Sequence, residues 1–178
     1  VRDFVADNQH HMPQPNSDFV TGHDAEFSAK LGAQGWIGMT WPTQYGGAEQ
    51  SNFERLVVTE ELLAAGAPVS AHWIADRQSG PLLLRFGTPE QRQRYLPGIA
   101  SGQSYFSIGM SEPDTGSDLA SVRTTAVAEG DAYRINGTKI WTTDAHRNHY
   151  IICLVRTEAP SENRHAGFSQ IIVDLKND

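Results

Sequence analysis

The chain has 178 residues, of which 39% are hydrophobic and 20% charged, and its formal net charge is −7. This length suits one large domain or two small ones, and the acidic balance argues against nonspecific nucleic-acid binding, which needs a basic surface. The sequence contains no run of about 18 apolar residues and no secretory signal, so we expect neither a membrane span nor export.

The cysteine and histidine content narrows the possible chemistry. A single cysteine, Cys153, rules out an internal disulfide framework and fits a reducing, cytoplasmic location. The seven histidines lack partners at metal-ligand spacing, so we expect no metal site. The first residue is Val1 rather than methionine, which suggests that these residues belong to a longer chain.

The first half of the sequence predicts helices. Residues 1–20 are expected to be irregular, because two prolines interrupt them. A short amphipathic helix follows around Phe27 and Leu31. Two later helices are expected to begin with capping boxes at Ser51 and Thr88, where the hydroxyl caps a backbone N–H and a residue three positions on reaches back.

A further helical segment, residues 71–81, carries several polar side chains beside Trp73 and Ile74. These polar residues either line a pocket or form a buried polar network, and the sequence leaves both readings open. They are His72, Asp76, Arg77 and Gln78.

From Ser104 onward the pattern becomes extended. Residues 130–131 and 136–137 are expected to form turns, and Asn-Gly at the second of these is the strongest short signal for a hairpin. Helices followed by strands predict an α+β chain, with one domain at 1–102 and another at 103–178. The predicted strands are 122–129, 132–136, 138–142, 150–156 and 168–175.

Two small polar segments in the second half form a candidate ligand site. The first, residues 111–118, reads Ser-Glu-Pro-Asp-Thr-Gly-Ser-Asp and follows the apolar run 106–110. Its Gly116 permits a left-handed backbone or close approach by a ligand, and consecutive N–H groups in such a turn can bind an anion. An ordinary polar connection between strands is the alternative. No histidine and acid can be placed beside Ser111 or Ser117, so nucleophilic catalysis is not expected.

The second segment is Trp141-Thr142-Thr143. In an alternating strand, Trp141 and Thr143 would point to the same face. The indole could then stack on a conjugated ring while a hydroxyl binds the edge of that ring. A half-buried strand tryptophan beside threonines is the alternative reading.

Residues 110–118 and 136–143 resemble the two flavin-contacting motifs of the acyl-CoA dehydrogenase family. Residues 41–47, Trp-Pro-Thr-Gln-Tyr-Gly-Gly, resemble an element of that family's N-terminal helical domain. Residues 86–97 are similar to the family's helix start before the β-domain. The resemblance covers nearly the whole chain, in the family's order and spacing.

The resemblance implies an N-terminal all-α domain followed by an incomplete β-barrel middle domain, with the family's C-terminal helical domain absent from this chain. It implies FAD as the cofactor and α,β-dehydrogenation of an acyl-CoA thioester, with the β-hydride passing to flavin N5. The family's catalytic base comes from the C-terminal domain, so no catalytic residue is assigned in this chain, and Glu112 is interpreted as structural.

The resemblance also implies which residues contact the ligands. Ser117 would lie near both the flavin and the bound acyl-CoA, and the hydroxyl or main chain of Thr143 would reach flavin N5. The implied flavin contacts are Ile108, Met110, Ser111, Gly116, Ser117, Trp141, Thr142 and Thr143.

Two departures from the common family pattern bear on substrate and geometry. Residues 114–115 are Asp-Thr where the commoner form has Gly-Ala, and aspartate tolerates a left-handed turn. Residues 144–146 are Asp-Ala-His where many members have Asn-Gly-Gly. Together with residues 71–78, this variant resembles a bacterial branch that includes dehydrogenases for steroid and other bulky acyl-CoAs.

The implied partners are an electron-transferring flavoprotein and further subunits of a homo- or hetero-oligomer, a tetramer built as a dimer of dimers. Two other functions fit the same motifs. One is a non-catalytic flavin- or acyl-CoA-binding subunit of a hetero-oligomer. The other is a flavin-dependent oxidase or monooxygenase relative.

Overall fold

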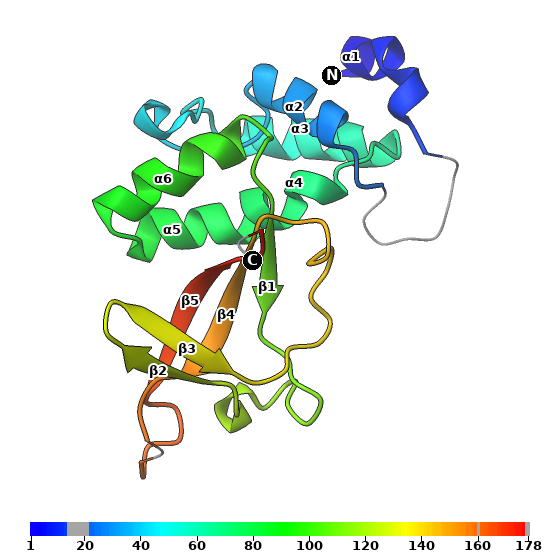
Figure 1. Ribbon diagram of the computed structural model, residues 1–178. Helices are drawn as coiled ribbons and strands as arrows, with labels where there is room; N and C mark the ends of the chain where they lie inside the picture. Colours follow the sequence, from blue (N-terminus) through cyan, green and yellow to red (C-terminus); the bar gives the residue numbers. More distant parts are fainter. Residues whose placement is uncertain (14–21, 160, 177–178) are drawn as a thin grey trace. The chain divides into compact units, whose positions relative to one another are not determined.

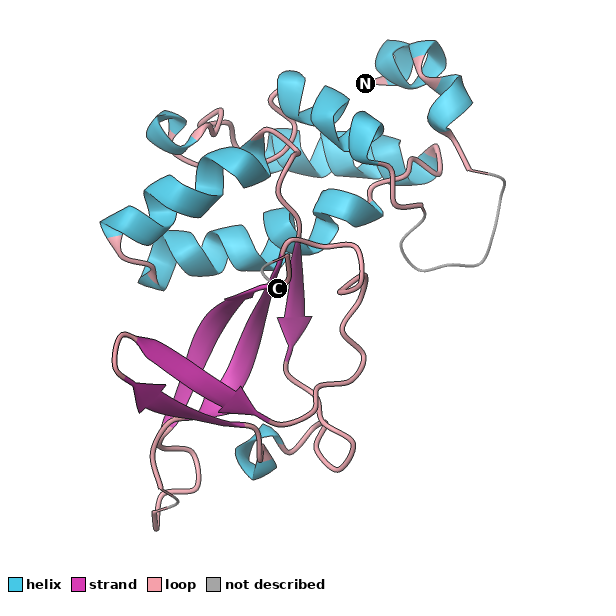
Figure 2. Ribbon diagram, viewed as in Figure 1, coloured by secondary structure: helices cyan, strands magenta, loops and turns pink. Residues whose placement is uncertain are grey.

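The computed structural model describes residues 1–13, 22–159 and 161–176, and the chain forms two compact units (Figure 1). The units are Val1–Tyr105 and Phe106–Asp178, whereas the sequence-based division lies between residues 102 and 103. The α-helices belong to the first unit and the strands to the second (Figure 2). None of the helices in the described ranges is long and apolar enough to cross a membrane.

The first unit is helical, as its sequence pattern predicts. Both capping boxes are confirmed: the hydroxyls of Ser51 and Thr88 accept from the N–H groups of Glu54 and Gln91, each at 3.2 Å. The side chains of Glu54 and Gln91 in turn accept from the two N-cap N–H groups. The α-helices are α1 Arg2–Asp7, α2 Ala25–Ala33, α3 Asn52–Ala64, α4 Ser70–Ile74, α5 Gly80–Phe86 and α6 Pro89–Ala100.

The expectation of an irregular N-terminus is wrong for the described residues before Pro13. They form α1 and a short 3₁₀ helix, Gln9–His11, while residues 14–21 lie outside the described part of the chain. The Phe4 ring packs 5.1 Å from Trp36 and 5.7 Å from Phe27. Helices this short depend on tertiary packing, which local sequence signals do not report.

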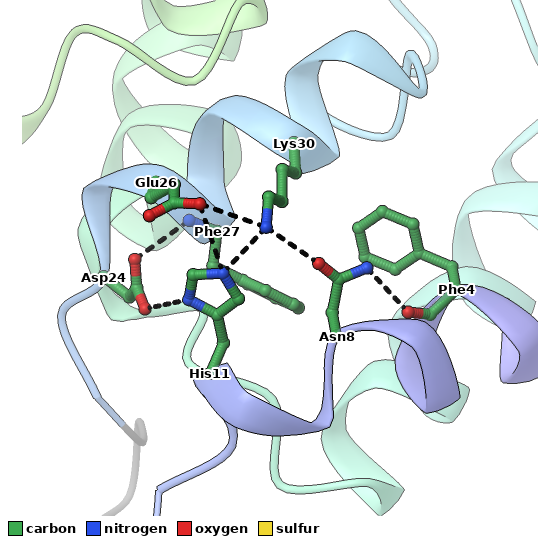
Figure 3. Close-up of polar contacts among 7 residues, drawn as sticks. All are labelled: Phe4, Asn8, His11, Asp24, Glu26, Phe27 and Lys30. Carbon is green, nitrogen blue, oxygen red and sulfur yellow. Dashed lines mark hydrogen bonds and ion pairs between the residues drawn. The ribbon is translucent and has the colours of Figure 1, made fainter.

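A polar cluster joins this N-terminal segment to α2 (Figure 3). Nδ1 of His11 lies 2.7 Å from the Asp24 carboxylate, which also caps α2 by accepting from the N–H of Phe27. The ammonium of Lys30 donates to Nε2 of His11 at 2.9 Å and to the side-chain amide oxygen of Asn8 at 3.0 Å. These contacts anchor the first helical turns of the chain.

Two of the four polar residues of this helical segment, His72 and Asp76, are buried within the first unit, whereas Arg77 is half-buried and Gln78 is exposed. A five-residue π-helix, Ala75–Ser79, joins α4 to α5 and includes the buried Asp76. The Asp76 carboxylate accepts from the N–H of Gly38 at 2.8 Å, and Nδ1 of His72 lies 2.8 Å from the Ser28 hydroxyl. Burial lowers the pKa of His72 to about 3, so this imidazole is neutral near pH 7.

The second unit is a five-stranded sheet centred on β4. β5 pairs antiparallel along the length of β4, while β1 pairs parallel with its first four residues and β2 meets it at Arg156. The sheet is open over the described residues, so the predicted β-barrel is an incomplete one. The strands are β1 Phe106–Gly109, β2 Thr125–Glu129, β3 Ala132–Asn136, β4 Tyr150–Arg156 and β5 Phe168–Asp174.

One predicted hairpin and one predicted strand are wrong. β2 and β3 are joined by the expected turn at residues 130–131. No strand begins directly after Asn136-Gly137, and residues 138–142 have no regular structure. Gly137 instead permits close contact, because a Cβ there would lie 2.3 Å from the Thr124 hydroxyl oxygen. Beyond it the chain continues to the loop after β1, where Ile140 donates to the Ser111 carbonyl at 3.0 Å.

Candidate functional site

The two predicted ligand segments lie side by side in the second unit. The loop after β1 and the segment after β3 are joined by the Ile140 to Ser111 backbone hydrogen bond. The Lys139 ammonium adds a hydrogen bond to the Met110 carbonyl at 3.1 Å. Residues about thirty positions apart in the sequence therefore form one surface.

The loop after β1 is a tight turn closed by reciprocal backbone hydrogen bonds. Glu112 donates to the Thr115 carbonyl at 2.8 Å, and Thr115 donates back at 3.0 Å. Gly116 does not have a positive φ, and no atom lies within 4 Å of a Cβ built there, so the left-handed interpretation of Gly116 is wrong. Asp114 does not have a positive φ either, so this turn does not require a residue that tolerates left-handed backbone.

Glu112 is the buried centre of this loop. One of its carboxylate oxygens accepts from the Arg123 N–H at 2.8 Å, and the other accepts from the Thr124 N–H at 2.9 Å and from the Thr124 hydroxyl. The second oxygen also accepts from the Lys139 ammonium at 2.9 Å. Burial alone would raise the pKa of Glu112, but these hydrogen bonds outweigh it and hold the pKa at about 2.

Trp141 does not belong to a strand. Its φ is 57°, and its side chain is 86% exposed. The prediction that Trp141 and Thr143 share a strand face is therefore wrong, because strand alternation does not apply to a left-handed residue. A bulky L-residue with positive φ is uncommon. The exposed indole leaves an aromatic face on which a flat ligand could stack.

The Thr143 end of this segment is held by buried polar side chains. The Ser107 hydroxyl donates to the Thr143 carbonyl at 2.8 Å, and it accepts from the Asn148 amide at 2.9 Å. The same amide donates to the Phe106 carbonyl at 3.0 Å. Sequence analysis did not single out Ser107, Asn148 or Lys139 as site residues, because their partners are remote in the chain.

The remaining predicted site residues offer hydroxyl and apolar groups. Ile108 and Met110 are half-buried on β1 and directly after it, while Ser117 is exposed. Within the described ranges, four hydroxyl groups of the site have no hydrogen-bond partner. They are those of Ser111, Ser117, Thr142 and Thr143.

This donor set fits a ligand with a flat ring and polar edges, as the flavin of FAD has. The exposed indole supplies a stacking surface, and the unpaired hydroxyls supply hydrogen-bond donors. Among the described residues, no group of three or more histidine, cysteine, aspartate or glutamate side chains is placed to hold a metal ion. The chain therefore consists of a helical unit followed by a sheet unit, and the sheet unit carries the candidate ligand surface.

Comparison with known proteins identifies the family. The family model described as acyl-CoA dehydrogenase, N-terminal domain, matches residues 1–103, and that for the middle domain matches residues 107–178. The chain belongs to the acyl-CoA dehydrogenase family.

The relatives include a protein named acyl-CoA dehydrogenase and a solved structure titled steroid ACAD. Acyl-CoA dehydrogenase FadE26 of Mycobacterium tuberculosis is 42% identical over 150 residues, which are 83% of this chain and 37% of that protein. A structure titled Tcur3481-Tcur3483 steroid ACAD is 43% identical with a TM-score of 0.78, covering 84% of this chain and 38% of that one. The ChsE4-ChsE5 complex of M. tuberculosis is 41% identical with a TM-score of 0.77, covering 85% and 39%. The chain thus spans less than two fifths of these relatives.

Proposed function

We propose that this chain supplies the flavin-facing part of an FAD-dependent acyl-CoA dehydrogenase, which carries out α,β-dehydrogenation of a CoA thioester. The observation that carries the proposal is Trp141, an exposed aromatic residue with left-handed backbone beside the unpaired hydroxyls of Thr142 and Thr143. Family membership supports FAD as the ligand of this surface.

Bound FAD would supply the hydride acceptor, and the residues of this chain would hold it. Trp141 would stack on the ring, and a hydroxyl or main-chain group of Thr143 would donate to its N5 edge. Ile108 and Met110 would line the ring. Ser111, Gly116 and Ser117 would contact the cofactor from the loop after β1, with Ser117 also facing the acyl-CoA.

The similarity to known proteins supports a proposal for the substrate and the electron acceptor. A bulky acyl-CoA, such as a steroid thioester, is supported by the similarity to the steroid ACAD. An electron-transferring flavoprotein would accept the electrons. The α-proton would be removed by a carboxylate outside residues 1–178, since none in this chain matches the family's base.

A non-catalytic subunit of a hetero-oligomer is the second candidate. Its support is that two similar solved structures are titled as pairs of differently named components. If this chain is such a subunit, its flavin surface would serve a site completed by another chain.

The full-length protein with its natural partner chains tests the flavin role. Trp141→Ala is expected to lower the ratio of bound flavin to protein, measured by visible absorbance, because the stacking surface is lost. Tyr133→Ala is the matched control, since Tyr133 is 56% exposed on β3 and outside the site. Unchanged flavin occupancy in Trp141→Ala would contradict the stacking role.

Anaerobic reduction separates the candidate activities. A bulky acyl-CoA should bleach the flavin band of a dehydrogenase without forming peroxide when air is admitted. Rapid peroxide formation would indicate an oxidase instead. A protein that binds flavin but is not reduced when reconstituted with its partner would fit the non-catalytic subunit.

A further inference from the structure

The segment that carries Trp141 is held on its N-terminal side by a buried ion pair. The side chains of Lys139 and Glu112 are only 8% and 6% exposed, and their charged atoms lie 2.9 Å apart. Glu112 cannot move freely, because the backbone N–H groups of Arg123 and Thr124 hold both of its oxygens. Lys139, two residues before Trp141, is therefore tied to a fixed anchor.

A second buried contact holds the C-terminal side. Ser107 is fully buried in β1, and its hydroxyl donates to the carbonyl of Thr143, two residues after Trp141. Asn148, itself 2% exposed, fixes this hydroxyl through its amide group. Both contacts connect the Trp141 segment to β1 or to the loop that follows it.

The Trp141 side chain is not buried, unlike the side chains that hold the residues on either side of it. Its indole is 86% exposed, so packing cannot compensate for the left-handed backbone at φ 57°. Such a conformation is unfavourable for an L-residue and persists only when the surrounding structure imposes it. The constraint comes from contacts on either side of Trp141, which include the two side-chain contacts above and the backbone hydrogen bond from Ile140 to Ser111.

We propose that Lys139 with Glu112, and Ser107 with Asn148, are positioning residues that preset Trp141 in its ligand-facing conformation before a cofactor binds. This inference rests on the proposed function for the identity of the ligand, but not for the constraint itself. A preset aromatic surface lowers the ordering cost of binding, so loss of either contact should weaken flavin affinity without removing any flavin-touching atom.

The constraint is tested by fluorine NMR of the full-length protein, labelled with 5-fluorotryptophan and freed of flavin. The fluorine resonance of Trp141 reports whether this side chain has one conformation or several. The Trp141 line is assigned by its loss in Trp141→Phe, and the buried Trp41 serves as an internal reference for folding. A single narrow Trp141 line is expected in the unmodified protein. Lys139→Met and Ser107→Ala should each broaden, shift or split that line while the Trp41 line stays in place.

Arg134→Met is the matched control, because it removes a surface ion pair with Glu129 in the same unit, whose side chains are 71% and 51% exposed. It should leave the Trp141 line unchanged. Lys139→Arg keeps the positive charge and should restore the line toward its original shape. If Lys139→Met does not fold, the Trp141 line of Ser107→Ala tests the inference, because this substitution deletes only one oxygen atom. A Trp141 line unchanged in folded Lys139→Met or in Ser107→Ala overturns the inference.

A flavin titration separates this inference from the proposed function. In Lys139→Met and Ser107→Ala we expect the FAD dissociation constant to rise roughly tenfold, with Arg134→Met unaffected. If the unmodified protein binds no FAD but its Trp141 line responds as expected, the proposed function fails and the positioning role stands. If FAD binds and the dissociation constant is the same in all variants, the positioning role is contradicted and the proposed function is not.

Discussion

Glu112 has the most strongly perturbed carboxylate of the candidate site. Burial would raise its pKa, yet the hydrogen bonds from Thr124, Arg123 and Lys139 hold the pKa at about 2. In the unfolded chain a glutamate titrates near pKa 4.3. The folded state therefore binds fewer protons between about pH 2 and 4, and Glu112 stabilises it above that range.

The stability of Glu112→Gln should depend on pH in a defined direction. At pH 7 the variant is expected to lose on the order of 3 kcal/mol, because a neutral amide loses the charge-assisted hydrogen bonds from Thr124, Arg123 and Lys139. The difference from the unmodified protein should shrink as the pH falls from about 4.3 toward 2, where Glu112 itself becomes protonated. Urea denaturation at pH 7 and pH 3 measures it, and an equal difference at both pH values would argue against the low pKa.

The start of a helix is determined by residues close together in the sequence, and the capping box of α6 allows this to be tested. Thr88→Ala should destabilise the protein by about 1 kcal/mol, because the Gln91 N–H loses its cap. Thr88→Ser keeps the hydroxyl and should retain most of the stability. Urea denaturation compares the two, and equal losses would indicate that the Thr88 methyl group, not the hydroxyl, stabilises the helix start.

In the sheet unit, by contrast, the path of the chain between strands depends on residues that are distant in the sequence. β2 and β3 turn at residues 130–131, as the turn residues Gly130-Asp131 predict. Asn136-Gly137 has the strongest local hairpin signal, yet the chain goes on to hydrogen-bond with Ser111 instead. A local turn preference is small compared with a buried ion pair and a backbone hydrogen bond formed a few residues later.

For the whole molecule, the proposed flavin surface would be only one side of a binding site. Trp141 remains 86% exposed, and the chain spans less than two fifths of FadE26 and of the steroid ACAD chain. We therefore expect residues 1–178 alone to bind FAD weakly, since under the proposed function further segments and subunits would complete the site. Fluorescence titration with FAD measures this, with the full-length protein as the reference. Tight one-to-one binding by residues 1–178 would refute the expectation.

Much of this architecture can be read from the sequence. Capping boxes, the change from helical to extended pattern and most strand positions are local signals, because each depends on residues within a few positions of one another. The family motifs likewise identify residues 110–118 and 136–143, since their order and spacing are written in the chain.

Only the tertiary structure decides how these motifs act together. It replaces a predicted strand by a left-handed Trp141, orders the first residues into helices, and pairs Glu112 with Lys139 across 27 positions. The physical reason is that burial and hydrogen bonding between distant segments outweigh local propensity when the two compete. The sequence therefore names the residues of the candidate site, and long-range contacts determine the conformation in which they meet a ligand.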